Sequence, residues 1–160
     1  SGVDGATVQA EPLQFPDFDP GRVGRVFGGN PNLIASLAAR GFVPVLAPIA
    51  ADSLGQFLNI NADSFAAGLA RILNAKHLIL LSDVPGVLDG DGKKIERIQA
   101  HQVDDLLKTG VLRSGMIPKV KAALDAAREA HCEVNIASWN EIGILEKILH
   151  GESVGTAIES

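Results

Sequence analysis

The sequence predicts an α/β protein built as a three-layer sandwich, with helices on both faces of a mainly parallel central sheet. Short runs rich in Val, Ile and Leu alternate along the chain with stretches of helical periodicity, which is the pattern of strand–helix units. The chain has 160 residues, of which 46% are hydrophobic, so it is long enough for one domain with a substantial core. Residues 77–82, HLILLS, are apolar at most positions, as in a strand covered on both faces.

The first predicted elements are a helix and a strand. Residues 30–41, NPNLIASLAARG, predict a helix that Asn30 caps and Gly41 ends, with a proline in its first turn. Residues 42–49, FVPVLAPI, then predict a buried strand. Because proline lacks the N–H that a strand donates, Pro44 indicates an edge position or a bulge there.

The remaining elements continue the alternation to the end of the chain. They are, in order, a helix in 61–75, a buried strand at 77–82, a hairpin turning around 89–92, a short helix at 102–108, a helix from Pro118 onward, a strand at 133–138, a helix that Gly151 ends, and a short strand near 155–159. Sheets of this kind bind their ligands at the carboxyl ends of the strands, so the residues that follow the predicted strands are the first candidates for a site.

Composition excludes several classes of function. The net charge is −5 and there is no basic run, so nucleic acid is not an expected partner. No stretch approaches the ~20 apolar residues of a membrane span, and no signal peptide is evident. The single cysteine, Cys132, is expected to be a small buried hydrophobe rather than a nucleophile, and it fits a reducing compartment because it has no partner for a disulfide. These features predict a soluble cytoplasmic protein.

Three short polar side chains surround the start of the second predicted helix. Side chains alternate in an extended segment, so Asn59, Asn61 and Asp63 are expected to project to one side. One interpretation is structural: Asp63 or Ser64 caps the helix and the asparagines are turn residues. The other is functional: the two amides orient a polar substrate, and the carboxylate holds a lysine in place.

The segment LLSDVPGVLDGDG, residues 80–92, runs from a buried strand into Ser82 and Asp83 and then into a Pro-Gly pair. It is either a solvent-facing turn, because serine, aspartate, proline and glycine are all turn formers, or a nucleotide cradle. In a cradle, backbone N–H groups and small residues let a purine and a ribose approach. The residues alone leave both interpretations open.

Lys119 occupies an unusual position, directly after Pro118 in the first turn of its predicted helix. The helix dipole is positive at that end, so a cation there is mildly unfavourable. Either the side chain leans into water, or an anion lies beside it, since a helix N-terminus binds phosphate through its free N–H groups. The phosphate motifs GxxxxGK[ST] and GxGxxG are absent, so any nucleotide would be bound without a Walker loop.

The stretches NINAD, LLSDVPGVLDGDGK and SGMIPKVKAALDAA, in this order, resemble the amino acid kinase family, and within it the acetylglutamate branch. The likeness covers nearly the whole chain from about Arg22 onward. It implies the fold shared by amino acid kinases and carbamate kinases, and it implies an enzyme that transfers a phosphoryl group from ATP to a carboxyl group.

The resemblance also implies roles for individual residues. Asn59, with Asn61 beside it, would bind the substrate. Asp63 would hold the active-site lysines in place, and Lys119 would stabilise the transition state at the phosphates of ATP. The nucleotide site would be formed by Ser82, Asp83, Val84, Pro85, Gly86, Val87, Leu88, Val111, Leu112, Arg113 and Met116. Mg²⁺ would be bound mainly through the nucleotide phosphates, without a dedicated protein ligand.

The implied reaction is the phosphorylation of N-acetyl-L-glutamate in arginine biosynthesis. The alternatives are a kinase for N-acetyl-aminoadipate and a non-catalytic kinase-like module that senses an amino acid or supports a partner. Family members begin with a strand that bears a lysine and paired glycines, whereas this sequence opens SGVDGATVQA, without methionine and as if in mid-domain. Residues 1–160 are therefore expected to be the nucleotide-binding part, of very low activity alone, with the N-terminal substrate-binding part absent. The complete enzyme would be a homodimer.

Overall fold

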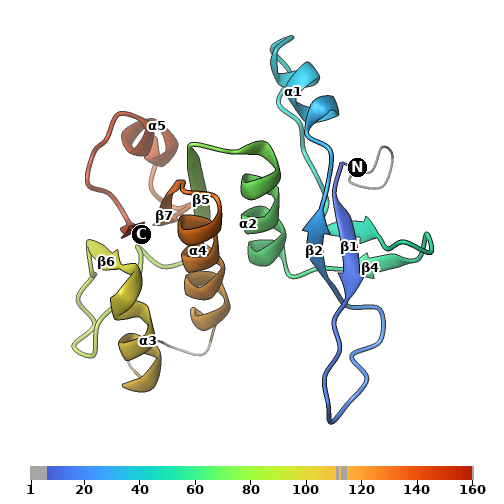
Figure 1. Cartoon of the computed structure of the whole chain (residues 1–160). Helices are drawn as coiled ribbons and strands as arrows, with labels where there is room; N and C mark the ends of the chain where they lie inside the picture. Colours follow the sequence, from blue (N-terminus) through green and yellow to red (C-terminus); the bar gives the residue numbers. More distant parts are fainter. Residues whose placement is uncertain (1–6, 111, 113–114, 160) are drawn as a thin grey trace. The chain divides into compact units, whose positions relative to one another are not determined.

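The structure is a computed structural model that describes residues 7–110, 112 and 115–159 (Figure 1). The chain divides into two compact units, residues 1–73 and 74–160. Among the described residues, no helix has both the length and the apolar character to cross a membrane.

Within residues 7–73, the first unit contains one four-stranded sheet and two helices. Its elements are β1 (Gln9–Pro12), β2 (Gly24–Gly28), α1 (Asn32–Ala38), β3 (Ile49–Ala51), β4 (Phe57–Asn59) and α2 (Ala62–Leu73). The strand order is β2-β1-β3-β4, in which β1 and β3 are parallel and the two outer pairings are antiparallel. Helices α1 and α2 confirm the two helices predicted for this part of the chain.

Helix α2 covers one face of this sheet. Ala50 and Leu58, which are opposite each other on β3 and β4, pack in a common core with Phe65 of the helix. Gly68 allows the helix to approach β2 closely, because a Cβ at this position would lie only 2.5 Å from the Cβ of Val26. The inward face of each strand is therefore apolar and covered.

The described part of the second unit contains another four-stranded sheet and three helices. Its elements are β5 (His77–Ser82), β6 (Arg97–Gln99), α3 (Ala100–Lys108), α4 (Ile117–Glu129), β7 (Glu133–Ser138), α5 (Ile144–Leu149) and β8 (Thr156–Glu159). The strand order is β5-β7-β8-β6. The pairings β5–β7 and β6–β8 are parallel and β7–β8 is antiparallel, so the sheet is mixed but mainly parallel.

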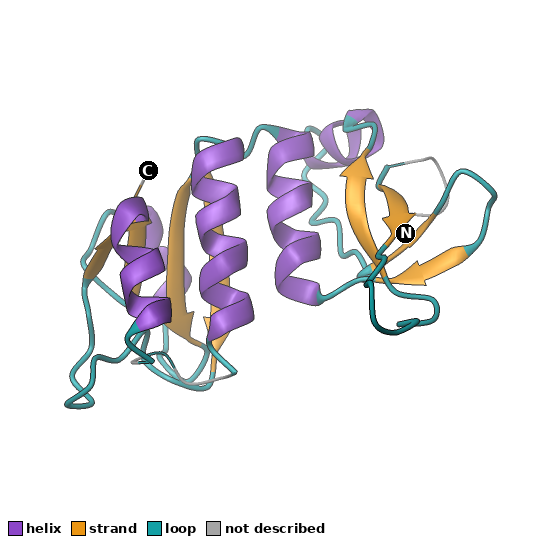
Figure 2. Ribbon diagram, turned by 60° about the horizontal axis from the view of Figure 1, so that its bottom comes forward, coloured by secondary structure: helices purple, strands orange, loops and turns teal. Residues whose placement is uncertain are grey.

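Helices lie on both faces of the second sheet. Helices α3 and α4 lie side by side on one face, where α4 contacts β5, β7 and β8 (Figure 2). Helix α5 packs against the other face through Ile144 and Ile148, which contact Ala137 of β7. The second unit is thus a three-layer α/β sandwich, and the predicted fold class is confirmed.

The strand predicted at residues 42–49 is wrong over most of its length. Strand β3 begins only at Ile49, and residues 42–48 form no strand. Pro44 and Pro48 account for this, since neither has an N–H to donate to a neighbouring strand.

Smaller differences concern boundaries and one hairpin. Helix α5 begins at Ile144 rather than near Asn140, because Gly143 takes a φ of +75° that a continuing helix does not permit. The hairpin predicted around 89–92 is a tight turn closed by a single bridge between Leu88 and Lys94. The antiparallel pair of β1 and β2 was not predicted from the sequence. Its strands are joined by a long loop, whereas the sequence pattern of a hairpin depends on a two-residue turn.

Candidate functional site

A cavity of about 530 Å³ opens where strand β5 ends, within the second unit. Its wall comes from the turn after β5, from the glycine-rich turn that follows, and from the segment that leads into α4. The lining residues are Ser82, Asp83, Val84, Gly86, Leu88, Asp89, Gly90, Gly92, Gly110, Leu112, Gly115 and Met116. The volume lies within the range of small-molecule sites.

The structure brings most of the residues predicted for a nucleotide site into this one cavity. Those that line it are Ser82, Asp83, Val84, Gly86, Leu88, Leu112 and Met116. Pro85 and Val87 belong to the same turn but do not line the cavity, and Val87 is fully buried. Val111 and Arg113 lie outside the described residues.

The position of the cavity follows from the parallel pairing of β5 with β7. The two strands pair along their whole length, and the N–H of Trp139 donates a hydrogen bond to the carbonyl of Ser82 (3.1 Å) where both strands end. The hydroxyl of Ser82 then donates to the carboxylate of Asp83 (3.2 Å) at the start of the turn. The cavity therefore lies at the edge of the sheet where α/β proteins bind ligands.

Thr156 of β8 holds the turn after β5 in place. Its fully buried hydroxyl accepts a hydrogen bond from the N–H of Val87 (2.8 Å) and donates one to the carbonyl of Ile95 (2.6 Å). Gly86 permits this close approach, because a Cβ there would lie 2.5 Å from the Thr156 hydroxyl oxygen. Sequence analysis missed Thr156, since the local pattern around residues 82–88 carries no signal of a partner on the last strand.

Five more residues line the cavity: Asp89, Gly90 and Gly92, which belong to the candidate segment 80–92 but had no individual assignment, and Gly110 and Gly115. The carboxylate of Asp89 shapes the glycine-rich turn, since it accepts hydrogen bonds from the N–H groups of Asp91 (3.0 Å) and Lys93 (2.8 Å). The glycines leave room for a ligand to approach the backbone. The density of glycines on both sides of the predicted residues is the signal that could have identified them.

Helix α4 begins at the rim of the cavity. Met116, the residue before its first turn, lines the cavity, and Lys119 lies half-buried within that first turn. The positive end of the helix dipole and the lysine ammonium both favour an anion at this place. Lys119 is not among the residues that line the cavity, and an anion beside it stays a prediction.

In the first unit, Asn61 caps helix α2. Its side-chain carbonyl accepts hydrogen bonds from the N–H groups of Asp63 and Ser64, both at 3.1 Å. The structural interpretation that Asp63 or Ser64 is the cap is therefore wrong. Asp63 lies half-buried in the first turn of α2, and Asn59 is exposed at the end of β4. Because Asn61 supplies the cap, helix α2 does not need Asp63 for this purpose.

The Asn61→Ala variant is expected to lose about 1 kcal/mol of stability, because two N–H groups at the start of α2 lose their acceptor. Asn61→Asp keeps a capping oxygen and is expected to recover most of that loss. Denaturant unfolding of both variants measures the effect. Equal losses in the two variants would contradict a capping role for the side chain.

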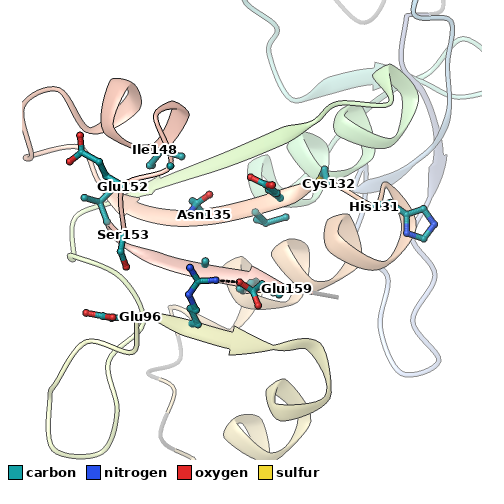
Figure 3. A pocket seen from close by; sticks show the side chains of 15 residues that line it. Glu96, His131, Cys132, Asn135, Ile148, Glu152, Ser153 and Glu159 are labelled. Carbon is teal, nitrogen blue, oxygen red and sulfur yellow. Dashed lines mark hydrogen bonds and ion pairs between the residues drawn. The ribbon is translucent and has the colours of Figure 1, made fainter.

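A second cavity, of about 410 Å³, also lies in the second unit, beside β7, β8 and the loop between α5 and β8 (Figure 3). Asn135 belongs to its lining, and Glu159 forms an ion pair with Arg97 at its wall. Glu96 and Glu152 add further carboxylates to the same lining. None of the predicted site residues lines this cavity.

Thiol and metal chemistry find no support among the described residues. Cys132 is buried, as predicted, and burial raises the pKa of its thiol. A raised pKa keeps the thiol protonated at neutral pH, so Cys132 is a poor nucleophile. No group of three or more His, Cys, Asp or Glu side chains in this part of the chain could hold a metal ion.

A three-layer α/β unit with a glycine-lined cavity at a strand end, and a helix N-terminus at its rim, is the architecture of α/β proteins that bind phosphate-bearing ligands. The model of the amino acid kinase family matches residues 1–138, and the chain belongs to this family. The resemblance noted from the motifs is thereby confirmed. The match also includes residues 1–21, where no motif of the family stands out.

Curated acetylglutamate kinases are similar to the whole chain. The acetylglutamate kinase of Nitrosospira multiformis is 40% identical, over 100% of this chain and 57% of that protein. The acetylglutamate kinase of Serratia proteamaculans is 43% identical, over 98% of this chain and 59% of that protein. The chain therefore spans less than two thirds of the length of these relatives.

Solved structures share the fold. The protein smu.665 of Streptococcus mutans is 32% identical with a TM-score of 0.81, over 97% of this chain and 57% of that chain. The carbamate kinase of Giardia lamblia bound to AMP-PNP has a TM-score of 0.67 at 22% identity, over 86% of this chain and 52% of that chain. The second likeness concerns the fold alone.

Proposed function

We propose that this chain carries the ATP site of an enzyme that phosphorylates the side-chain carboxylate of N-acetyl-L-glutamate. The γ-phosphoryl group would pass from ATP to a carboxylate oxygen of the substrate, giving ADP and N-acetylglutamyl 5-phosphate, a cytoplasmic step of arginine biosynthesis. Relatives at about 40% identity bear the name of this enzyme. Since the chain spans only part of their length, the reaction is assigned to a complete enzyme of which this chain supplies the nucleotide site.

The cavity at the end of β5 is the observation that carries this proposal. Residues from two separate segments contribute to one wall: the first runs from Ser82 to Gly92, and the second supplies Gly110, Leu112, Gly115 and Met116. The glycines in that wall admit a flat base and a ribose close to the backbone, while the start of α4 provides positive potential for phosphates.

Lys119 would offset the charge that builds on the phosphoryl group during transfer. Phosphoryl transfer depends chiefly on positioning and on electrostatic stabilisation, so a cation next to the phosphates is the main contribution that a protein can make. The attacking oxygen belongs to the carboxylate of the substrate, and no protein nucleophile or base is required.

The polar residues of the first unit would serve the substrate side of the reaction. Asp63 would hold the active-site lysines in place, and Asn59 would bind the acetylglutamate. Asn61 uses its carbonyl oxygen as the cap of α2. Its NH₂ group would therefore be the part of this side chain that donates to the substrate.

Mg²⁺ would enter the site with the nucleotide, bound mainly through the phosphates. The lining contains two carboxylates, Asp83 and Asp89, which would repel a polyphosphate without a cation. These two carboxylates therefore fit a nucleotide whose phosphates carry Mg²⁺. In such sites Mg²⁺ typically keeps phosphate oxygens and water molecules as its ligands. When bound, it would neutralise part of the phosphate charge.

Calorimetric titration of MgADP into the purified chain tests the nucleotide site. We expect saturable binding with a Kd on the order of micromolar to millimolar, the range of ordinary substrate constants. A folded chain that does not bind MgADP would contradict the proposal. The chain alone is also expected to turn over far more slowly than the ~10 s⁻¹ of a typical enzyme, because it spans only 57% and 59% of the two kinases described above.

A substrate panel with the complete enzyme separates the acetylglutamate reaction from its alternatives. N-acetyl-L-glutamate is expected to be the preferred acceptor. Preference for N-acetyl-aminoadipate would assign the enzyme to the related lysine-type reaction. Nucleotide binding without phosphorylation of either acceptor would indicate the non-catalytic module, although Asp63 and Lys119 argue against a pure sensor because a sensor needs neither.

A further inference from the structure

Lys94 lies at the base of the glycine-rich turn that forms part of the cavity wall, and its side chain is half-buried, whereas the neighbouring Lys93 is exposed. In the part of the chain that the structure describes, the Lys94 ammonium forms no ion pair and no hydrogen bond. A lysine can bury its stem and keep its ammonium in water, so burial alone assigns no role. The direction of the side chain is the more informative observation.

The backbone pairing of this turn fixes the direction of the Lys94 side chain. Leu88 and Lys94 are opposite each other in an antiparallel bridge. Backbone hydrogen bonds of 2.8 Å join the residues that flank this pair: the N–H of Asp89 to the carbonyl of Lys93, and the N–H of Ile95 to the carbonyl of Val87. A pair flanked in this way brings its two side chains onto the same face, with Cβ atoms about 4.5–5.5 Å apart.

This face is the one that meets the cavity, because Leu88 is a lining residue. The Lys94 side chain therefore starts beside a lining side chain and on its side of the turn. Lys94 is not itself among the lining residues, but its long unbranched stem is able to carry the ammonium past Leu88 to a ligand. Side chains alternate along a strand, so Lys93 projects from the opposite face.

The charge of the cavity wall gives a second reason to expect a cation here. Asp83 and Asp89 contribute two carboxylates, and none of the described residues that line the cavity is a lysine or an arginine. A nucleotide brings further negative charge to this wall. Like charges at close range repel one another, so a bound nucleotide is stabilised by any cation that reaches it. Lys94 is placed to supply such a cation from the side of the turn.

We propose that Lys94 is a further nucleotide-binding residue, whose ammonium donates a hydrogen bond to an acceptor atom of the bound nucleotide. The inference rests on the proposed function of the cavity and adds to it a residue that no motif in the sequence indicates. Both the phosphates and the nucleoside offer acceptor atoms to a lysine, which has three N–H donors. Comparison of MgADP with adenosine identifies which part of the nucleotide receives the hydrogen bond.

Calorimetric titration of MgADP and of adenosine into the full chain tests the contact in the wild type, in Lys94→Met and in Lys94→Arg. Methionine keeps a flexible apolar stem, so Lys94→Met should keep the melting temperature of the wild type. It is expected to bind MgADP about tenfold more weakly, because a hydrogen bond from a charged group is lost. Lys94→Arg keeps the charge and is expected to recover most of the affinity. An equal loss for adenosine assigns the acceptor to the nucleoside, and a loss confined to MgADP assigns it to the phosphates.

Lys93→Met is the matched control, since it removes the same charge from the exposed neighbouring position and should bind MgADP as the wild type does. Equal affinity of Lys94→Met and the wild type for MgADP would overturn the inference and leave the nucleotide site intact. Equal losses in Lys93→Met and Lys94→Met would also overturn it, because the general charge of the turn would explain both. A folded wild-type chain that does not bind MgADP would contradict the proposed function itself, and the role of Lys94 with it.

Discussion

The Lys119→Ala variant is expected to bind MgADP about 10- to 100-fold more weakly than the wild-type chain. A hydrogen bond or close contact to a charged group contributes roughly 1.5–3 kcal/mol, and about 1.4 kcal/mol corresponds to each tenfold in affinity. In the complete enzyme the same substitution is expected to lower the transfer rate by ~10²–10³, the usual effect of removing one electrostatic stabiliser. Calorimetry and single-turnover kinetics measure the two effects.

We expect Lys119→Ala to weaken MgADP binding without lowering the melting temperature of the chain. A cation in the first turn of α4 is mildly unfavourable, so its removal leaves the melting temperature unchanged or slightly raised. Lys121→Ala on the same helix is the control, because Lys121 is exposed and two residues further along. If both variants bound MgADP as well as the wild type, Lys119 would not contact the nucleotide. If both weakened binding equally, the general charge of the helix would explain the effect.

The second unit could be predicted from the sequence almost element by element. Strands β5 and β7 are confirmed at the predicted boundaries, 77–82 and 133–138, because the first is a short apolar run and the second alternates polar and apolar residues from Glu133 to Ile136. The cavity could be predicted in outline for a related reason. The residues that follow a parallel strand must lie at the edge where ligands bind, and Ser82 and Asp83 do line the cavity at that edge, while their role towards a nucleotide stays a prediction.

Long-range partners could not be predicted in the same way. Thr156 accepts a hydrogen bond from Val87 in the turn after β5, and the two residues are 69 positions apart in the sequence. No local sequence pattern around Thr156 indicates that its hydroxyl bonds to that turn. The strand expected at residues 42–49 failed for a different reason. Its apolar composition predicted burial, but Val43 and Val45 are exposed, and Pro44 and Pro48 have no N–H to donate to a neighbouring strand.

The Gly86→Ala variant is expected to destabilise the second unit by about 3 kcal/mol and to weaken MgADP binding at least tenfold. Gly86 takes a φ of +151°, which side chains other than glycine rarely adopt, and such strain costs of order 1–3 kcal/mol. The added methyl group would also lie 2.5 Å from the Thr156 hydroxyl oxygen, and overpacking adds a comparable cost. Denaturant unfolding and calorimetry of the same preparation measure both effects.

Gly90→Ala provides the matched comparison within the same cavity wall. Gly90 also lines the cavity, but a Cβ there meets no atom within 4 Å, and its φ is not positive. We therefore expect Gly90→Ala to match the wild type closely in both its stability and its affinity for MgADP.

The Thr156 hydroxyl is held by two hydrogen bonds. It can move away from a methyl group at Gly86 only by releasing the N–H of Val87, and with it the turn that forms the cavity. If Gly86→Ala lost stability but bound MgADP normally, this turn would not belong to the nucleotide site. If Gly90→Ala lost as much affinity as Gly86→Ala, the effect would come from crowding of the ligand instead of from the strained turn.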